Sequence, residues 1–142
     1  MKMEIQKITN QFKTPEIYKI YNSCMYMPTW EKFSALADEY IMNEHIQIYV
    51  AYDGEIPNGV LVVSSGDKAK FLILGIAVDS RCRGKGIGSQ LIFFIKNFNS
   101  EATVYAQTDE DAVVFYKKCG FQITKIEKQY GNDVCIRYDC IL

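Results

Sequence analysis

The hydrophobic pattern of this chain switches between a period near two and a period near 3.6 residues. Residues 3–8 alternate weakly and predict a first strand. Thr14 followed by Pro15 is typical of a helix start, and Thr29 can cap a second helix after the break at Pro28. The apolar residues of the two predicted helices recur at helical spacing: Ile17, Ile20, Tyr21 and Cys24, then Trp30, Phe33, Leu36, Ala37, Tyr40 and Ile41.

Three short runs with strand character follow these helices. Residues 45–51 alternate, and residues 59–63 are predicted to form a second strand after a hairpin signal at Asp53-Gly54. Residues 70–78 form the third predicted strand of this meander. The run from Phe71 to Val78 is apolar on both faces, which predicts that helices cover the strand on both sides.

The second half of the chain predicts a crossover and a closing hairpin. Ile87, Leu91, Ile92, Ile95 and Phe98 mark a buried helix, and residues 102–106 a strand that should run parallel to residues 70–78. Residues 108–111 predict a capping box for a last helix that ends at residue 120, and residues 121–129 and 134–141 pair. The order is β-α-α-β-β-β-α-β-α-β-β. We expect an α/β mixed sheet with packed helices, in one domain over residues 1–142.

Composition excludes several classes of protein. With 142 residues, 49% of them hydrophobic and 23% charged, the chain fits one globular domain. A net charge of −1 gives no reason to expect nucleic acid or an anionic membrane as partner. No apolar run approaches the roughly 20 residues of a membrane span, and the N-terminus carries no signal-peptide core, so we expect a cytoplasmic protein.

The cysteines predict no covalent framework. Their number is five, and no C-x-x-C pair occurs, which argues against both disulfides and a zinc site. We expect no metal. Cys135 and Cys140 lie in a strand pattern and are interpreted as small core residues.

A glycine-rich turn joins the strand at 70–78 to the next helix. Its glycines alternate with other residues in the run Arg83-Gly84-Lys85-Gly86-Ile87-Gly88-Ser89. A strand, such a turn and a helix start aim backbone N–H groups at one point, where they can hold a pyrophosphate. The alternative is a tight turn without a ligand. Walker A spacing is absent, and the third glycine of a dinucleotide fingerprint is replaced by Ser89.

Two blocks resemble the GNAT superfamily of N-acetyltransferases. Residues 83–88 resemble its Arg/Gln-x-x-Gly-x-Gly/Ala motif, and residues 75–79 resemble the strand that precedes it. Residues 108–121 resemble its penultimate helix, including the Phe-Tyr-x-x-x-Gly-Phe signature at residues 115–121. Both blocks stand in the family's order and cover residues 71–121.

The resemblance implies a GNAT-like fold, with a mostly antiparallel sheet of about six or seven strands flanked by about four helices. It also implies that acetyl-CoA lies where the fourth and fifth strands splay apart. The backbone of one strand would pair with the pantetheine arm, and the turn would hold the pyrophosphate. These cofactor-binding residues are Ile76, Ala77 and Val78, then Arg83, Gly84, Lys85, Gly86, Ile87, Gly88 and Ser89.

By the same resemblance, Tyr116 is the catalytic general acid that protonates the leaving CoA thiolate, since a phenol pKa of about 10 suits that task. The alternative is that Tyr116 is an aromatic on a buried helix face. Asp109 stands where many family members have Asn. A backbone N–H among residues 76–78 would hold the oxyanion. Cys82 and Cys119 flank the motifs, but no Cys–His pairing is visible, so we expect no covalent step.

The sequence names no general base. Glu31, Asp38, Glu39, Glu44 and His45 are conceivable, and each is as readily a surface residue. The aromatic residues of the first two helices either line an acceptor pocket or form core: Tyr18, Tyr21, Tyr26, Trp30 and Tyr40.

We therefore predict an N-acetyltransferase that moves an acetyl group from acetyl-CoA to a small-molecule or peptide amine by direct attack, with a homodimer left open. One alternative is a non-catalytic acyl-CoA sensor or interaction module. Another is a nucleic-acid binder using Arg81, Arg83 and Lys85, which the charge balance disfavours.

Overall fold

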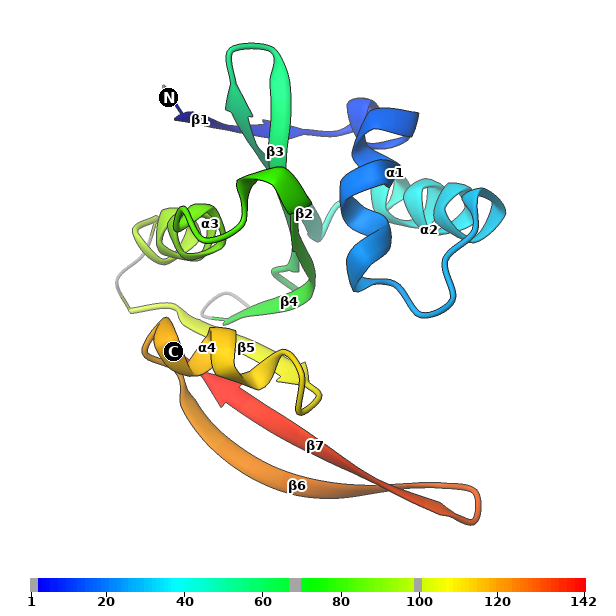
Figure 1. The fold of residues 1–142 in the computed structure, drawn as a ribbon, viewed down its shortest axis with the longest axis vertical. Helices are drawn as coiled ribbons and strands as arrows, with labels where there is room; N and C mark the ends of the chain where they lie inside the picture. Colours follow the sequence, from blue (N-terminus) through cyan, green and yellow to red (C-terminus); the bar gives the residue numbers. More distant parts are fainter. Residues whose placement is uncertain (1–2, 67–69, 99–100) are drawn as a thin grey trace.

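The computed structural model describes residues 3–66, 70–98 and 101–142, and Figure 1 shows its fold. Its strands form one sheet in the order β1-β2-β3-β4-β5-β7-β6. Neighbouring strands are antiparallel except for β4 and β5, which run parallel as predicted. The strands are β1 (Met3–Ile8), β2 (Ile46–Asp53), β3 (Ile56–Ser64), β4 (Lys70–Val78), β5 (Thr103–Thr108), β6 (Gln122–Tyr130) and β7 (Asp133–Ile141). The predicted α/β mixed sheet and the element order are confirmed.

The four helices divide between the two faces of the sheet. They are α1 (Pro15–Tyr21), α2 (Trp30–Met42), α3 (Ile87–Lys96) and α4 (Val113–Lys118), with short 3₁₀ turns η1 (Asn10–Phe12), η2 (Asn22–Cys24) and η3 (Ser80–Cys82). Figure 1 places α1 and α2 on one side of the central strands and α3 on the other, while the β6–β7 hairpin extends away from the helices.

Side-chain caps begin the first two helices, as predicted. Thr14 Oγ1 accepts a hydrogen bond from the Ile17 N–H at 3.3 Å, and Thr29 Oγ1 accepts one from the Lys32 N–H at 3.1 Å. The predicted capping box at residues 108–111 is wrong. Thr108 ends β5 in a buried position, so its side chain does not cap; Asp109 Oδ1 instead accepts from the Ala112 N–H at 3.0 Å.

Each face of the sheet has its own core. Phe12, Phe33 and Tyr21 fill the core under α1 and α2, with ring centroids 5.0–6.3 Å apart. The other core joins α3 and α4 to the sheet through apolar residues of both helices: Ile87, Leu91, Ile92, Ile95, Tyr116 and Cys119. The helices of the second core are those that carry the two motif blocks.

A bulge in β4 changes the face of the sheet toward which the following side chains point. Ile73 pairs with Val63 and Gly75 with Val62, so Leu74 has no partner in β3. Ile73 packs in the α3/α4 core, whereas Gly75 faces Tyr21 of α1, and a Cβ on Gly75 would lie 1.9 Å from the Tyr21 hydroxyl. The glycine is therefore required for α1 to pack on this strand.

The prediction that helices cover both faces of β4 is wrong for its first half. The side chains of Leu72 and Leu74 are 45% and 38% exposed. The residues of β4 that pack in the α1/α2 core come after the bulge, so Leu72 and Leu74 precede the covered half.

Three residues expected in the core lie at the surface. Trp30 is the first residue of α2, and its ring leans on the edge of the core at 5.7 Å from Tyr18. Phe98 follows the last turn of α3 and packs its ring 4.9 Å from Phe94. Cys135 is exposed in the part of the hairpin that no helix covers, whereas Cys140 is buried as predicted.

Candidate functional site

Strands β4 and β5 separate after only a short ladder. They pair at Lys70–Thr103, Phe71–Val104 and Leu72–Tyr105, and no pairing follows. Beyond this point β5 continues to pair with β7 on its other side. The second half of β4 therefore has one edge open toward β5, and a cleft of about 1160 Å³ lies there.

The start of α3 lies at one part of this cleft and carries free donors. The first hydrogen bond of the helix runs from the Gln90 N–H to the Gly86 carbonyl at 3.0 Å, so the N–H groups of residues 87–89 have no partner within the helix. Gly86 has φ +79° and Gly84 φ +81°, which favour glycine. A Cβ on either would meet no atom within 4 Å, so a ligand can approach this backbone closely.

Gly88 differs from the other two glycines of the turn. A Cβ there would lie 2.9 Å from the ring of Phe115 on α4. Gly88 therefore lets α3 and α4 pack together, and a hydrogen bond of 3.3 Å between the Ser89 hydroxyl and the Cys119 thiol also joins them.

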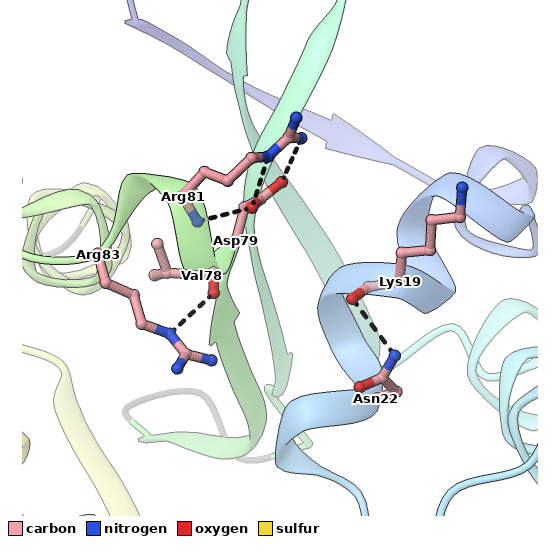
Figure 2. A network of polar contacts seen from close by, with 6 residues as sticks. All are labelled: Lys19, Asn22, Val78, Asp79, Arg81 and Arg83. Atoms are coloured by element: carbon pink, nitrogen blue, oxygen red, sulfur yellow. Dashed lines mark hydrogen bonds and ion pairs between the residues drawn. The ribbon is translucent and has the colours of Figure 1, made fainter.

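One ion pair and several hydrogen bonds hold the turn that leads into α3, as Figure 2 shows. Asp79 accepts from the Arg81 N–H at 3.0 Å and from Arg81 Nη2 at 2.9 Å. These hydrogen bonds to Arg81 lower the pKa of the Asp79 carboxyl. Arg83 Nε donates to the Val78 carbonyl at 3.3 Å, so that carbonyl points away from β3. These contacts fix the orientation of the end of β4, which lines the cleft.

A second cavity of about 820 Å³ adjoins this turn. Figure 2 shows the turn facing α1, where Asn22 Nδ2 donates to the Lys19 carbonyl at 3.3 Å. Lys19, Arg81 and Arg83 line the cavity together with Glu16. Glu55 and Asp79 line it as well, so its charges are balanced, and Arg83 lines both this cavity and the cleft.

Tyr116 of α4 lines the same cleft. Its side chain is 6% exposed, and its ring lies 5.2 Å from the rings of Phe115 and Phe121. Burial raises the pKa of the Tyr116 phenol well above its ordinary value of 10.0, so the group keeps its proton at physiological pH. A buried, protonated phenol at a cleft wall is chemically suited to donate a proton.

Cys24, one of the cysteines of the cleft, is a poor nucleophile. Cys24 of η2 lines the cleft, and burial raises the pKa of its thiol to about 11, against the opposing effects of Tyr21 and of the Ile76 backbone. Its Sγ donates to the Tyr21 carbonyl at 3.2 Å. His45 does not line the cleft and pairs instead with Glu44 at 3.6 Å. No Cys–His pair forms in the cleft among the residues that the structure describes.

Most of the residues that the sequence singled out come together here. All of the predicted cofactor-binding residues except Lys85 line the cleft, as does Tyr116: Ile76, Ala77, Val78, Arg83, Gly84, Gly86, Ile87, Gly88 and Ser89. Asp109 lines it too. The five conceivable bases do not: Glu31, Asp38, Glu39, Glu44 and His45. Of the N-terminal aromatics Tyr26 alone is in its lining, whereas Tyr21 and Tyr40 are buried core.

Other lining residues were missed by the sequence reasoning. They include Cys24, Met25, Gln107, Asp111 and Arg137. Arg137 lies in a hairpin strand whose alternation carries no motif, so only the pairing of β7 beside β5 places it here.

Two further observations concern the described residues, 3–66, 70–98 and 101–142. No three His, Cys, Asp or Glu side chains gather there in a way that could hold a metal ion. Every helix in those ranges is too short or too polar to cross a membrane.

A family model described as "Acetyltransferase (GNAT) domain" matches residues 44–123. No protein with a curated description matches the chain by sequence. Solved structures resemble it in fold. An acetyltransferase from Thermus thermophilus has a TM-score of 0.76 at 15% identity, over 100% of this chain and 98% of that one.

Two other solved structures are similar. The ribosomal-protein-S18-alanine N-acetyltransferase from Escherichia coli has a TM-score of 0.76 at 15% identity, over 99% of this chain and 93% of that one. A GNAT family acetyltransferase from Elizabethkingia anophelis, solved with acetyl-CoA bound, has a TM-score of 0.69 at 20% identity, over 99% and 97%.

Proposed function

The chain belongs to the GNAT acetyltransferase family, and from that membership we propose that it moves an acetyl group from acetyl-CoA to a primary amine. One observation carries the proposal: the gap between β4 and β5 has free helix N–H groups and a buried, protonated tyrosine in the same cleft.

The residues of the cleft fit the parts of acetyl-CoA. The N–H groups at the start of α3, beside the open backbone of Gly84 and Gly86, would hold the pyrophosphate, with Arg83 adding positive charge. The open edge of β4 would pair with the pantetheine arm as an added strand would. The Val78 carbonyl points away from β3, and the Ile76 backbone faces the Cys24 thiol. The backbone groups of these two residues, on either side of Ala77, are therefore directed toward the open edge.

The reaction is direct transfer in a ternary complex. A neutral amine attacks the thioester carbon, the N–C bond forms, the nitrogen loses one proton to solvent water, and the C–S bond breaks. Tyr116 gives its proton to the departing thiolate and regains one from solvent, and a backbone N–H among residues 76–78 would hold the oxyanion. The high pKa of the Cys24 thiol favours direct transfer over a covalent cysteine intermediate.

Two measurements, made one after the other, test the proposed function. Acetyl-CoA should raise the melting temperature of the protein, as a ligand of the native state does. Free-thiol detection with a panel of primary amines should then show acetyl-CoA turnover that depends on the amine. Binding without turnover of any amine would favour the non-catalytic acyl-CoA sensor instead.

A further inference from the structure

Arg137 of β7 lies in the cleft, and no carboxylate among residues 3–66, 70–98 and 101–142 forms an ion pair with it. Its side chain is half-buried, and its Nε atom is buried without a hydrogen-bond partner in the described part of the chain. Arg81, by contrast, is paired with Asp79. Leaving a buried donor of a cation without a hydrogen bond costs free energy, so the site is suited to bind an anion from solution.

The carboxylates nearest to Arg137 make other contacts or lie beyond ion-pair distance from it. Asp139, two residues along β7, accepts from Gln107 Nε2 at 2.9 Å. Asp109 and Asp111 line the same cleft, but no ion pair within 4.0 Å links either of them to Arg137. Their presence still disfavours a doubly charged ligand such as a phosphate, and it leaves a single negative charge as the better match for one guanidinium.

The face on which Arg137 lies is fixed by strand alternation. Tyr138 and Cys140 of β7 pack in the core under α3 and α4. Side chains alternate along a strand, so Arg137 and Asp139 point to the opposite face, and the hydrogen bond between Asp139 and Gln107 of β5 agrees. That face is the one on which α1 and η2 lie, away from Tyr116 and the start of α3.

Strand register places Arg137 level with the acetyl end of the proposed cofactor. Leu72 of β4 pairs with Tyr105 of β5, and three residues further along the two strands lie Gly75 and Thr108. Thr108 pairs with Tyr138, the neighbour of Arg137. Arg137 thus lies across the gap from the Gly75–Ile76 backbone, on the side from which an acceptor can approach.

Resting on the function proposed above, we propose that the acceptor is an amino acid or a related amino-carboxylate, and that Arg137 binds its carboxylate. A guanidinium binds a carboxylate through two parallel N–H···O hydrogen bonds, which also fixes the orientation of the bound molecule. Holding the carboxylate across the gap leaves the amine free to reach the thioester.

The test compares matched acceptors. Each amino acid is assayed beside its amide and its decarboxylated amine, by thiol release from acetyl-CoA, with kcat/KM corrected for the fraction of neutral amine. We expect the amino acid to exceed both relatives by about 10- to 100-fold, the range of a hydrogen bond to a charged group. Titration of the amino acid and its amide into the CoA-loaded protein gives the same comparison without turnover.

Variants separate this role from a general effect of charge. Arg137→Met should bring kcat/KM for the amino acid down to the level of its amide, and Arg137→Lys should keep part of the difference. Lys125→Met is the matched control, because Lys125 is an exposed cation of the same hairpin, pairs with Tyr138 and does not line the cleft.

Each other outcome overturns the proposal in a distinguishable way. Equal use of amino acid and amide by the native protein means that no carboxylate is recognised. A loss of acetyl-CoA affinity in Arg137→Met assigns the residue to the donor instead. If the protein acetylates only amines that carry no carboxylate, the proposed function stands and this inference is wrong. If acetyl-CoA does not bind at all, both are wrong.

Discussion

Replacing Tyr116 by Phe removes one oxygen atom from the wall of the cleft and leaves the ring in place. The ring keeps its contacts at 5.2 Å with Phe115 and Phe121. No hydrogen bond of the hydroxyl to another described residue would be lost, so the free energy of unfolding should change by less than about 1 kcal/mol. Tyr116→Ala would also remove the ring, at about 3–5 kcal/mol by analogy with Phe→Ala, and would confuse folding with catalysis.

The expected loss of activity follows from the role of the hydroxyl as proton donor. General acid catalysis contributes about 10²- to 10⁴-fold, and it is most effective when the pKa of the acid lies near the working pH. Burial raises the pKa of Tyr116 above 10.0, which makes it a weaker acid, so we expect the lower end of that range. A hundredfold fall in kcat corresponds to about 2.7 kcal/mol of barrier.

The assay measures initial rates of thiol release between pH 6 and pH 10. The native protein should show no alkaline limb from Tyr116 in this range, because the phenol keeps its proton beyond its ordinary pKa. The Phe variant should have a lower kcat and an unchanged Kd for acetyl-CoA. Tyr130→Phe is the control, since Tyr130 is 52% exposed and outside the cleft. A native kcat in Tyr116→Phe at every pH would refute the acid role.

Other variants test the glycines and the buried tyrosines. Gly86→Ala has space for its Cβ but positive φ, so it should cost about 1–2 kcal/mol of stability and lower acetyl-CoA affinity measured by calorimetry; unchanged affinity would contradict the cradle. Gly88→Ala should lose about 1–3 kcal/mol in urea unfolding through its contact with Phe115, and Phe115→Leu should restore part of it. Gly75→Ala should be more destabilising, because its Cβ meets the buried Tyr21 hydroxyl; a native melting temperature would count against this packing. Burial raises the pKa of Tyr21, so its stabilisation is complete below pH 10 and declines above it, and Tyr21→Phe should flatten the fall in melting temperature there.

Local rules in the sequence were enough for most of the elements. Thr14 and Thr29 cap their helices because a hydroxyl next to the first free N–H groups is a short-range effect. Thr108 failed as a cap because its buried place at the end of β5 is a long-range effect, decided by pairing with Tyr138. The same contrast explains Trp30, whose helical spacing predicted the core although the helix start lies at its edge.

The motif residues show which parts of the candidate site could be predicted from the sequence. The place of the turn at residues 83–89 followed from local chemistry, whereas Tyr116 was singled out because its block resembles the family motif, and both line the cleft. Gly88 needed the structure, since only the packing of α3 on α4 distinguishes a glycine that meets Phe115 from the two beside it that meet nothing.

By itself, the sequence determined the order of elements, the turn with free N–H donors and the family to which the chain belongs. The resemblance implied that the fourth and fifth strands splay apart, but only the tertiary structure decided that β5 leaves β4 after Leu72 to continue along β7. That exchange of partners opens the cleft, and it places Arg137, about 60 residues further along the chain, opposite Ile76. The physical reason is that strand pairing between distant segments depends on the packing of the whole sheet, which no local pattern of apolar and polar residues encodes.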